Sequence, residues 1–243
     1  MASAMGMVCM TDVEHSVDQH TYCCVSGPRR APASPMIARP MPRRYDAAMS
    51  NATQDRVQTS PTPLRFTREE YYRMAKARLF DGRRVELLEG EVIEMTPQGS
   101  RHAATVALIV ETLVRILSPS FSVRPQLPLV LDDHSEPEPD VAVCLRDPGH
   151  YAAEHPGPED VVLVIEVADT SLGYDRGRKA EAYARAGIGI LWIVDLATRC
   201  VEVFEEPNRE QSRYGREQLF AEGASLMLPN GTTIVASHLL PPA

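Results

Sequence analysis

Residues 160–168 read Asp-Val-Val-Leu-Val-Ile-Glu-Val-Ala, and this stretch leaves few options for the fold. Valine, leucine and isoleucine side chains fall on both faces of the strand that it predicts. A strand that is apolar on both faces belongs inside a sheet that is covered on each side. We therefore predict a layered α/β domain in which 160–168 is a central strand.

The apolar periods of the remaining chain place helices and strands around this strand. A capping box at Thr67 and Glu70 begins a first helix, which Asp81-Gly82 ends. Two more helices are predicted at about 103–117 and at 175–187, the latter ended by Gly187. The other predicted strands are 85–88, 91–95, 127–131, 139–145, 190–196 and 200–205, with two weaker ones at 214–220 and 232–236. This order predicts a mixed α/β domain around one sheet.

The first 60 residues differ in character from the rest. They carry the run Pro-Arg-Arg-Ala-Pro-Ala-Ser-Pro at 28–35 and no sustained apolar period. We predict a disordered N-terminal extension over residues 1–60 and one folded domain over residues 61–243. A second hypothesis is that translation starts at Met41 or Met49. The stretch lacks the apolar segment of a secretory signal.

Charge and cysteine content exclude several classes of protein. Lys+Arg 25 against Asp+Glu 33 gives a net charge of −8, which excludes a polybasic protein that binds nucleic acid through bulk charge. An enzyme with a local basic surface stays possible. No apolar run approaches the ~20 residues that cross a bilayer, so we expect no membrane association. The five cysteines show no metal-site or disulfide spacing, which favours the cytoplasm.

Three charged residues occupy positions at which the apolar pattern predicts buried, uncharged side chains. Asp140 begins the strand at 139–145, and Glu166 interrupts the central strand. Lys179 precedes Tyr183 by four residues and therefore turns toward the sheet on the inward face of its helix. A buried carboxylate is costly unless a cation or hydrogen bonds compensate it. The three residues are therefore expected to lie together.

Two carboxylates and a lysine suit metal-dependent hydrolysis of a phosphodiester. Carboxylate oxygens bind hard cations such as Mg²⁺ or Mn²⁺, which acidify a bound water, and a lysine can hold that water. The chain has only two lysines, Lys76 and Lys179, beside 23 arginines, which mildly favours a chemical role for Lys179. A structural alternative stays open, in which Glu166 pairs with Lys179 or Arg176 and Asp140 only caps its strand.

The order of these residues resembles the PD-(D/E)xK phosphodiesterases and, more closely, the Uma2 family of restriction endonuclease-like proteins. The matching stretches are VELLEGEVIEMTPQGSRH at 85–102, PEPDVAVC at 137–144 and LVIEVADTSLGYDRGRKAEAYARAGIGILWIVDL at 163–196. The resemblance implies a restriction-endonuclease-like fold, with a mixed central sheet flanked by helices. It also implies that Asp140, Glu166 and Lys179 line the site, with the lysine on the helix after the glutamate.

Weaker candidates come from the same stretches. Glu86 and Glu91 match acidic positions of the family's early hairpin, and one of them is a candidate to approach the metal. The alternative is a solvent-facing hairpin glutamate. His102 is a candidate proton relay or phosphate contact, or it makes a local hydrogen bond at a helix start. Asp175 is expected to cap the helix of Lys179.

Other prominent residues are expected to be structural. Trp192 and Tyr183 are expected in the core. The arginines at 83–84 and 176–178 are possible phosphate contacts, although most such clusters are solvated faces.

The sequence thus predicts a divalent-metal-dependent endonuclease that acts on DNA. In this hypothesis Asp140 and Glu166 hold Mg²⁺ or Mn²⁺, and Lys179 positions the attacking water. The rival is a catalytically inactive nuclease-like binding module of a defence or mobile-element system, which the acidic net charge favours. The resemblance suggests a homodimer. The apolar segment 190–205 is either its interface or core.

Overall fold

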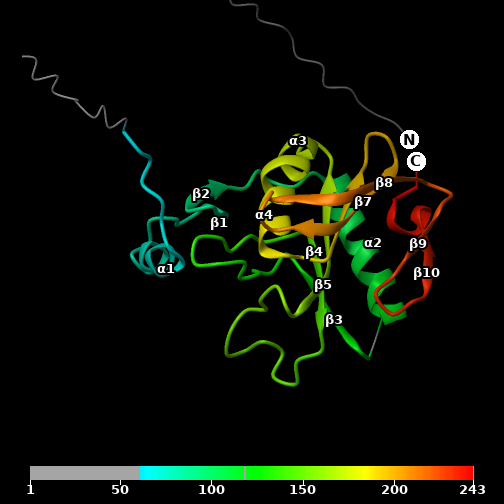
Figure 1. Ribbon diagram of the computed structural model, residues 1–243, viewed down its shortest axis with the longest axis horizontal. Helices are drawn as coiled ribbons and strands as arrows, with labels where there is room; N and C mark the ends of the chain where they lie inside the picture. The colour runs from blue at the N-terminus through cyan, green and yellow to red at the C-terminus, as the bar shows by residue number, and fades with distance from the viewer. Residues whose placement is uncertain (1–60, 118, 243) are drawn as a thin grey trace, which may run out of the picture. The chain divides into compact units, whose positions relative to one another are not determined.

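The computed structural model describes residues 61–117 and 119–242, and a mixed β-sheet lies at the centre of this part of the chain (Figure 1). Its strand order is β3-β4-β5-β6-β7-β8. The strands are β3 (Phe121–Pro125), β4 (Val141–Leu145), β5 (Val161–Ala168), β6 (Ile190–Asp195), β7 (Cys200–Asn208) and β8 (Arg213–Ala221). All neighbours are antiparallel except β5 and β6, which are parallel. The predicted α/β class, a mixed central sheet flanked by helices, is confirmed.

The central strand predicted at 160–168 is confirmed as β5. It lies between β4 and β6, and Leu163 and Ile165 are fully buried. Parallel pairing with β6 requires a crossover connection. The crossover consists of α3 (Leu172–Tyr174), the π-helix η1 (Asp175–Lys179) and α4 (Ala180–Ala186). The helix predicted at 175–187 is therefore present, but its first turn is wider than an α-helical turn.

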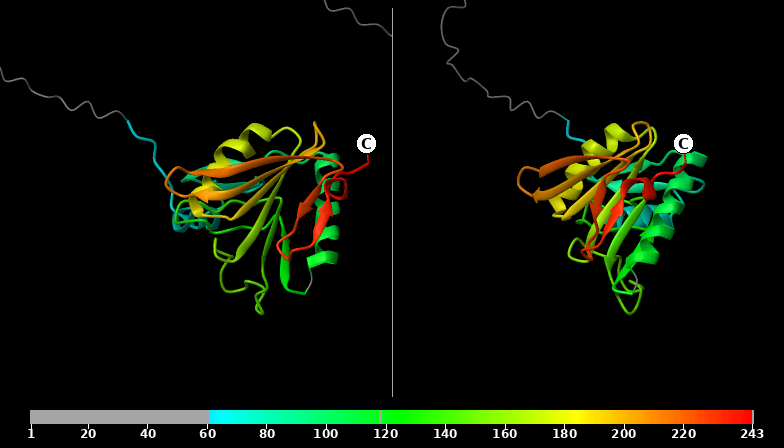
Figure 2. Two further views of the ribbon diagram at one scale, coloured as in Figure 1. Left: turned by 45° about the vertical axis from the view of Figure 1, so that its right-hand side comes forward. Right: turned by 90° about the vertical axis from the view of Figure 1, so that its right-hand side faces the viewer.

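Each face of the sheet has its own apolar cluster. On one face α2 (Ser100–Leu117) contributes Ile109 and Leu113, and packs with the C-terminal elements β9 (Ser225–Met227), β10 (Thr233–Val235) and η2 (Ala236–Leu239). Figure 2 shows α2 beside the β9–β10 hairpin on this side. On the other face Tyr183 of α4 packs against Val164 and Leu191. Segment 190–205 lies in the sheet as β6 and most of β7, so it is core.

The N-terminal part of the described chain forms a helix and a hairpin. Helix α1 (Arg68–Lys76) begins at the predicted capping box of Thr67 and Glu70. The predicted hairpin is formed by β1 (Val85–Leu88) and β2 (Glu91–Glu94), which are joined by a turn at Glu89 and Gly90, both with positive φ. Leu87 and Leu88 are fully buried, which anchors β1 to the rest of the domain.

One strand prediction is wrong. The chain at 127–131 is not a strand, and the first strand of the sheet is β3 at Phe121–Pro125. Gln126 has a φ of 51°, which turns the chain out of the sheet, and Pro128 has no N–H for a strand ladder. Leu129 is nevertheless fully buried, so the apolar pattern at 127–131 reports burial of a loop. The sequence does not predict the short strand β9, and β10 corresponds to the weak strand at 232–236.

The prediction of a disordered extension over residues 1–60 lies outside the described residues. The described residues belong to one compact unit. Within residues 61–117 and 119–242, no helix is both long and apolar enough to cross a membrane.

Gly187 ends the helix that carries Lys179, as predicted. Its φ of 88° is left-handed, and the N–H groups of Gly187 and Ile188 both donate to the Tyr183 carbonyl at 3.0 Å. A β-carbon at this position would meet the guanidinium of Arg209. Gly189 has no such restriction, since a β-carbon added there would have no other atom within 4 Å.

We expect Gly187→Ala to destabilise the domain by about 1–2 kcal/mol, because a β-carbon is strained at positive φ. Gly189→Ala is the matched control and should leave the melting temperature nearly unchanged. Thermal unfolding followed by circular dichroism measures both variants. Equal melting temperatures for the two variants would contradict a left-handed cap at Gly187.

Candidate active site

The register of β4 and β5 places Asp140 opposite Glu166. Val141 pairs with Ile165, so the residue before β4 faces the residue after Ile165. The Asp140 N–H donates to Oε2 of Glu166 at 3.4 Å. The Val167 N–H donates to Oδ2 of Asp140 at 2.9 Å. The two carboxylates that the sequence singles out therefore lie side by side on adjacent strands.

The crossover after β5 brings Lys179 to the same place. Lys179 is the last residue of η1 and is 5% exposed, and its Nζ lies 3.1 Å from Oε1 of Glu166. Four residues further on, the Tyr183 hydroxyl donates to the same Oε1 at 2.7 Å. Because both donors use Oε1, the other oxygen of Glu166 is left facing Asp140.

Glu86 of β1 also belongs to this group. It is 1% exposed, and its Oε2 lies 3.7 Å from Nζ of Lys179. The Glu138 N–H donates to Oε2 at 3.0 Å, and the Tyr174 hydroxyl donates to Oε1 at 3.4 Å. The alternative of a solvent-facing glutamate is therefore wrong for Glu86.

The prediction that Asp175 caps the helix of Lys179 is wrong. Asp175 is the first residue of η1, is 3% exposed and accepts a hydrogen bond from Oγ of Ser171 at 2.5 Å. Asp175, Lys179 and Tyr183 follow one another at intervals of four residues on the inward face of η1 and α4. The four-residue spacing can be seen in the sequence. An aspartate at a helix start and a tyrosine in an apolar stripe, however, usually have structural roles, so the sequence does not place Asp175 and Tyr183 in the site.

His102 reaches the site from the first turn of α2. Its Nε2 lies 2.9 Å from Oδ1 of Asp140, and the Gln126 side-chain amide is 3.5 Å from the same oxygen. No pattern in the sequence points to Gln126, because only the positive φ at that residue directs it to Asp140. His102 therefore ties the Asp140 carboxylate to α2.

Negative charge exceeds positive charge in this buried group. The ammonium of Lys179 faces four carboxyl groups in the described chain, which belong to Glu86, Asp140, Glu166 and Asp175. Burial raises the pKa of Glu166 to about 8, although Lys179 opposes this. Burial also raises the pKa of Asp175. A raised pKa means that the folded protein holds the proton of a carboxyl group up to a higher pH than the unfolded chain does, which offsets part of the excess charge.

The pKa values of Asp140, His102 and Lys179 shift in the direction that keeps these three groups charged. Burial acts to raise the pKa of Asp140, but the hydrogen bond from His102 and other contacts hold it below its ordinary value. The same hydrogen bond raises the pKa of His102. Burial opposes the charge on Lys179, but the carboxylates, Glu166 foremost, raise its pKa. The site is therefore a buried anionic group around one cation.

This donor set fits a divalent metal ion. Mg²⁺ is bound in proteins by one or two carboxylates and keeps several waters, and Asp140 with Glu166 supplies such a pair. A 2+ ion would neutralise charge that the protein otherwise offsets with a proton on Glu166. Asp140 and Glu166 would hold the ion, with Glu86 and Asp175 as further acidic neighbours.

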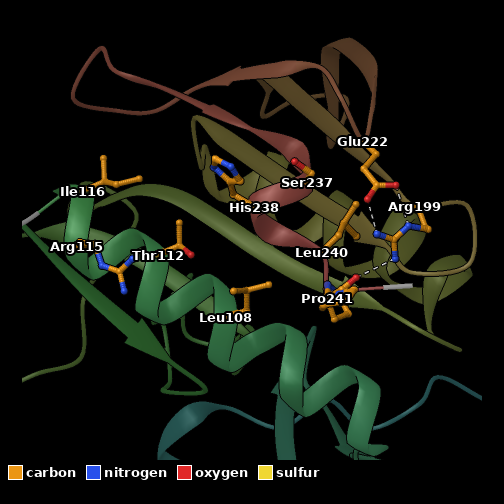
Figure 3. A pocket seen from close by; sticks show the side chains of 11 residues that line it. Leu108, Thr112, Arg115, Ile116, Arg199, Glu222, Ser237, His238, Leu240 and Pro241 are labelled. Carbon is orange, nitrogen blue, oxygen red and sulfur yellow. Dashed lines mark hydrogen bonds and ion pairs between the residues drawn. The ribbon is translucent and has the colours of Figure 1, made fainter.

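Access to the group is narrow. The most exposed members are His102 and Asp140, whose side chains are 14% and 11% exposed. Two cavities of the described chain are lined by other residues. One, of about 630 Å³, lies between α2 and the C-terminal segment (Figure 3), and the other, of about 620 Å³, lies beside the loop at 147–160. Within this group, His102 and Asp140 are therefore the residues most accessible to solvent.

Glu91 and the arginine segments lie elsewhere. Glu91 pairs with Arg178 at 2.7 Å and also with Arg65, on the outside of the hairpin. Arg178 also binds Glu89 at 3.2 Å. Arg176 forms a double hydrogen bond with Glu202, so the alternative pairing of Glu166 with Arg176 is wrong. These arginines are engaged by carboxylates.

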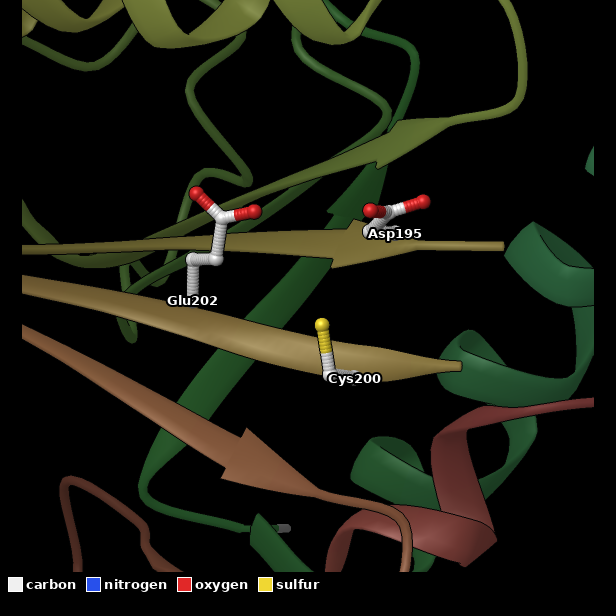
Figure 4. A group of neighbouring side chains, drawn as sticks. All are labelled: Asp195, Cys200 and Glu202. Atoms are coloured by element: carbon white, nitrogen blue, oxygen red, sulfur yellow. The ribbon is translucent and has the colours of Figure 1, made fainter. Parts of the chain in front are cut away.

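A second cluster of possible ligands is accounted for by the fold. Asp195, Cys200 and Glu202 on β6 and β7 place one ligand atom each within 4.8 Å of one another, which no other trio in the described residues does (Figure 4). Asp195 accepts hydrogen bonds from Ala197 N–H and from the Thr198 hydroxyl. Glu202 is neutralised by Arg176. The cluster therefore closes the β6–β7 turn and holds η1.

The raised pKa of Glu166 predicts a pH-dependent stability in metal-free buffer. A carboxyl whose pKa is higher in the folded state contributes stability that is present below its unfolded pKa of about 4.5 and is lost as pH rises toward 8. Glu166→Gln carries no titratable group and does not lose this contribution. We expect the melting temperature of the variant, relative to the parent, to rise between pH 5 and pH 8 by the equivalent of a few kcal/mol.

Differential scanning calorimetry in EDTA measures this difference. Glu91→Gln is the matched control, since Glu91 lies on the surface of the hairpin. A Glu166→Gln difference that is constant between pH 5 and pH 8 would contradict a proton on the buried carboxyl.

Comparison with known proteins identifies the family. The model of the family Uma2, described as "Putative restriction endonuclease", matches residues 68–237, which is well over half of the chain. A nuclease of DUF820 from Anabaena variabilis ATCC 29413, described as putative, is 18% identical in sequence; the match covers 64% of this chain and 88% of that one, with a TM-score of 0.47. No curated protein matches. The chain belongs to the Uma2 family of restriction endonuclease-like proteins.

Proposed function

We propose that this protein is a divalent-metal-dependent endonuclease that hydrolyses phosphodiester bonds of DNA. The observation that carries the proposal is the buried anionic group, in which Asp140 and Glu166 face each other and Lys179 contacts Glu166 at 3.1 Å. Burying several charges lowers the stability of the folded protein, so a group of this kind is a candidate for a functional role. Membership of the Uma2 family agrees with the proposal.

Each residue has a role that follows from its contacts. Lys179 and Tyr183 occupy one oxygen of Glu166 and so direct the other toward Asp140. His102 and the Val167 N–H hold the two oxygens of Asp140. The pair Asp140 and Glu166 thereby receives a defined orientation, which a metal site requires.

A bound Mg²⁺ or Mn²⁺ would polarise the phosphate and acidify a water. In the hydrolysis, a water oxygen forms a bond to phosphorus, one phosphorus–oxygen ester bond breaks, and the leaving oxygen takes up a proton. In this proposal the ammonium of Lys179 would stabilise the negative charge that develops on the phosphate oxygens. His102 lies on the open side of the group and is the residue nearest to solvent for proton transfer.

A second function is favoured by one observation. The acidic group is largely buried, and the hydrogen bonds within the protein already occupy most of its oxygens. A protein with this fold that only binds a partner would show the same closed site. The alternative is therefore a catalytically inactive nuclease-like binding module of a defence or mobile-element system. A homodimer and a cytoplasmic location stay predictions in either case.

Metal binding gives the first prediction of this proposal. Mg²⁺ or Mn²⁺ should raise the melting temperature, because a ligand at 100 times its Kd adds about 2.7 kcal/mol to the stability of the folded state. Asp140→Asn should abolish the increase by removing a charged ligand. Glu91→Gln, from the same early hairpin candidates, should keep it. An increase that survives in Asp140→Asn would remove Asp140 from the metal site.

Catalysis gives the second prediction. The protein should nick supercoiled plasmid in Mn²⁺ and not in EDTA. Lys179→Arg should fold and bind metal but lose nicking by about 10²-fold or more, since arginine keeps the charge but is bulkier and planar and cannot place it as the compact ammonium does. Lys76→Arg, on the exposed surface of α1, is the matched control and should nick like the parent.

Two outcomes decide between the functions. Nicking that survives in Lys179→Arg would show that the lysine supplies charge alone. Metal binding without any nicking by the parent protein would favour the binding module.

A further inference from the structure

Arg124 of β3 is the one buried arginine of the described residues, at 8% exposed. Its Nε has no hydrogen-bond partner, and no carboxylate oxygen of residues 61–117 and 119–242 lies within 4.0 Å of its guanidinium. Other arginines of this chain are paired, such as Arg68 with Glu136 and Arg84 with Glu138. A buried cation without an anion is costly. The absence of a partner therefore points to an anion supplied by a ligand.

The position of Arg124 relates it to the proposed active site. Arg124 pairs with Ala142, which belongs to the apolar cluster on the Tyr183 face of the sheet. Two residues further along the chain, the Gln126 N–H donates to the Asp140 carbonyl at 3.1 Å. Two residues of a strand span about 7 Å. Arg124 thus lies on the same face of the sheet as Asp140, about 7 Å from it along the strand direction.

Tyr151 covers Arg124. Its ring centroid lies 5.0 Å from Cζ of the guanidinium, which is a cation–π contact. Tyr151 has a φ of 58° and follows His150, which has a φ of 56°. Two successive non-glycine residues in the left-handed region are strained, and a bulky aromatic residue there is rare. The conformation that brings the Tyr151 ring onto Arg124 is therefore a strained one.

The Tyr151 side chain that covers Arg124 borders a cavity into which it can move. Tyr151 lines the cavity of about 620 Å³ between the loop at 147–160 and the chain at Val130 and Leu131. Its hydroxyl is tied to the Leu145 carbonyl at 2.7 Å by an exposed hydrogen bond. The acidic residues of this cavity, such as Asp147 and Asp160, would repel an anion that entered through it. On the Asp140 side, a divalent cation bound by Asp140 and Glu166 would offset the negative charge, so we expect an anion to reach Arg124 from that side when the metal is bound.

We propose that Arg124 binds a phosphate of the DNA strand that flanks the bond to be cut, and that Tyr151 covers the guanidinium until the strand arrives. This inference rests on the proposed function, because it places DNA at Asp140. Arg124 supplies two parallel N–H donors, which suit a phosphate. Tyr151 competes with the phosphate for the same cation.

The test measures binding of a short fluorescein-labelled DNA duplex by anisotropy, with Ca²⁺ as the hard cation and over a series of salt concentrations. Duplex integrity is checked on a gel afterwards. Arg124→Gln should weaken binding by about tenfold, the scale of one charged hydrogen bond, and should lower the slope of log K against log salt by about 1. Its melting temperature should change little, because the substitution removes a buried charge that has no carboxylate partner together with the cation–π contact to Tyr151.

Two further variants make the test directional. Tyr151→Leu should strengthen binding, since it uncovers the guanidinium and keeps an apolar side chain. Arg115→Gln removes an exposed positive charge of α2 that only pairs with Glu111, and should change neither the affinity nor the slope.

The inference is overturned if Arg124→Gln binds the duplex like the parent, or if the parent binds none. Its failure is distinguishable from that of the proposed function. If the parent protein nicks plasmid and Arg124→Gln keeps full affinity, only the proposed phosphate contact is rejected. If the parent protein binds the duplex and Arg124→Gln shows the predicted change in slope, but the parent never nicks plasmid, the phosphate contact is supported and the catalytic function is rejected.

Discussion

The ammonium of Lys179 among buried carboxyl groups is the interaction on which the rest of the site depends. Without it, Glu86, Glu166 and Asp175 would share a low-dielectric space without a cation, which is energetically prohibitive. With it, the group still carries excess negative charge, and the protein offsets part of this with a proton on Glu166. The same imbalance is what a divalent cation would relieve. Structural stability and the proposed metal binding therefore have one electrostatic cause.

The parallel pair β5 and β6 explains how Lys179 comes to Glu166. A parallel pair must be joined by a crossover, and this one returns over the face of the sheet that Glu166 occupies. The wider turn of η1 lies within that crossover, and it sets Asp175 and Lys179 inward ahead of Tyr183. Single π-helical turns of this kind are frequent at functional sites. On the opposite face α2 brings His102 to Asp140 at its first turn.

Much of this arrangement could be predicted. Glu166 and Asp140 are conspicuous because a charge in an apolar strand needs a partner, and Lys179 because its spacing from Tyr183 turns it inward. The sequence does not reveal Asp175, Tyr183 and Gln126 as neighbours of the site. An aspartate at a helix start and a tyrosine on an apolar stripe are usually structural, and Gln126 reaches Asp140 only through a backbone turn. The strand prediction at 127–131 is wrong because alternation cannot separate a buried loop from a strand.

The sequence by itself determined the layered α/β class, the central strand, the helix caps at Thr67 and Gly187, and the set of charges that had to be buried together. These features depend on the spacing of apolar residues along the chain and on the free-energy cost of burying an unpaired charge, and both can be read from the sequence. Only the tertiary structure decided that Glu86 is buried while Glu91 lies on the surface, and that Arg124 is left without a carboxylate. Those outcomes depend on which loops pack over which face of the sheet, and such long-range contacts leave no local period in the sequence.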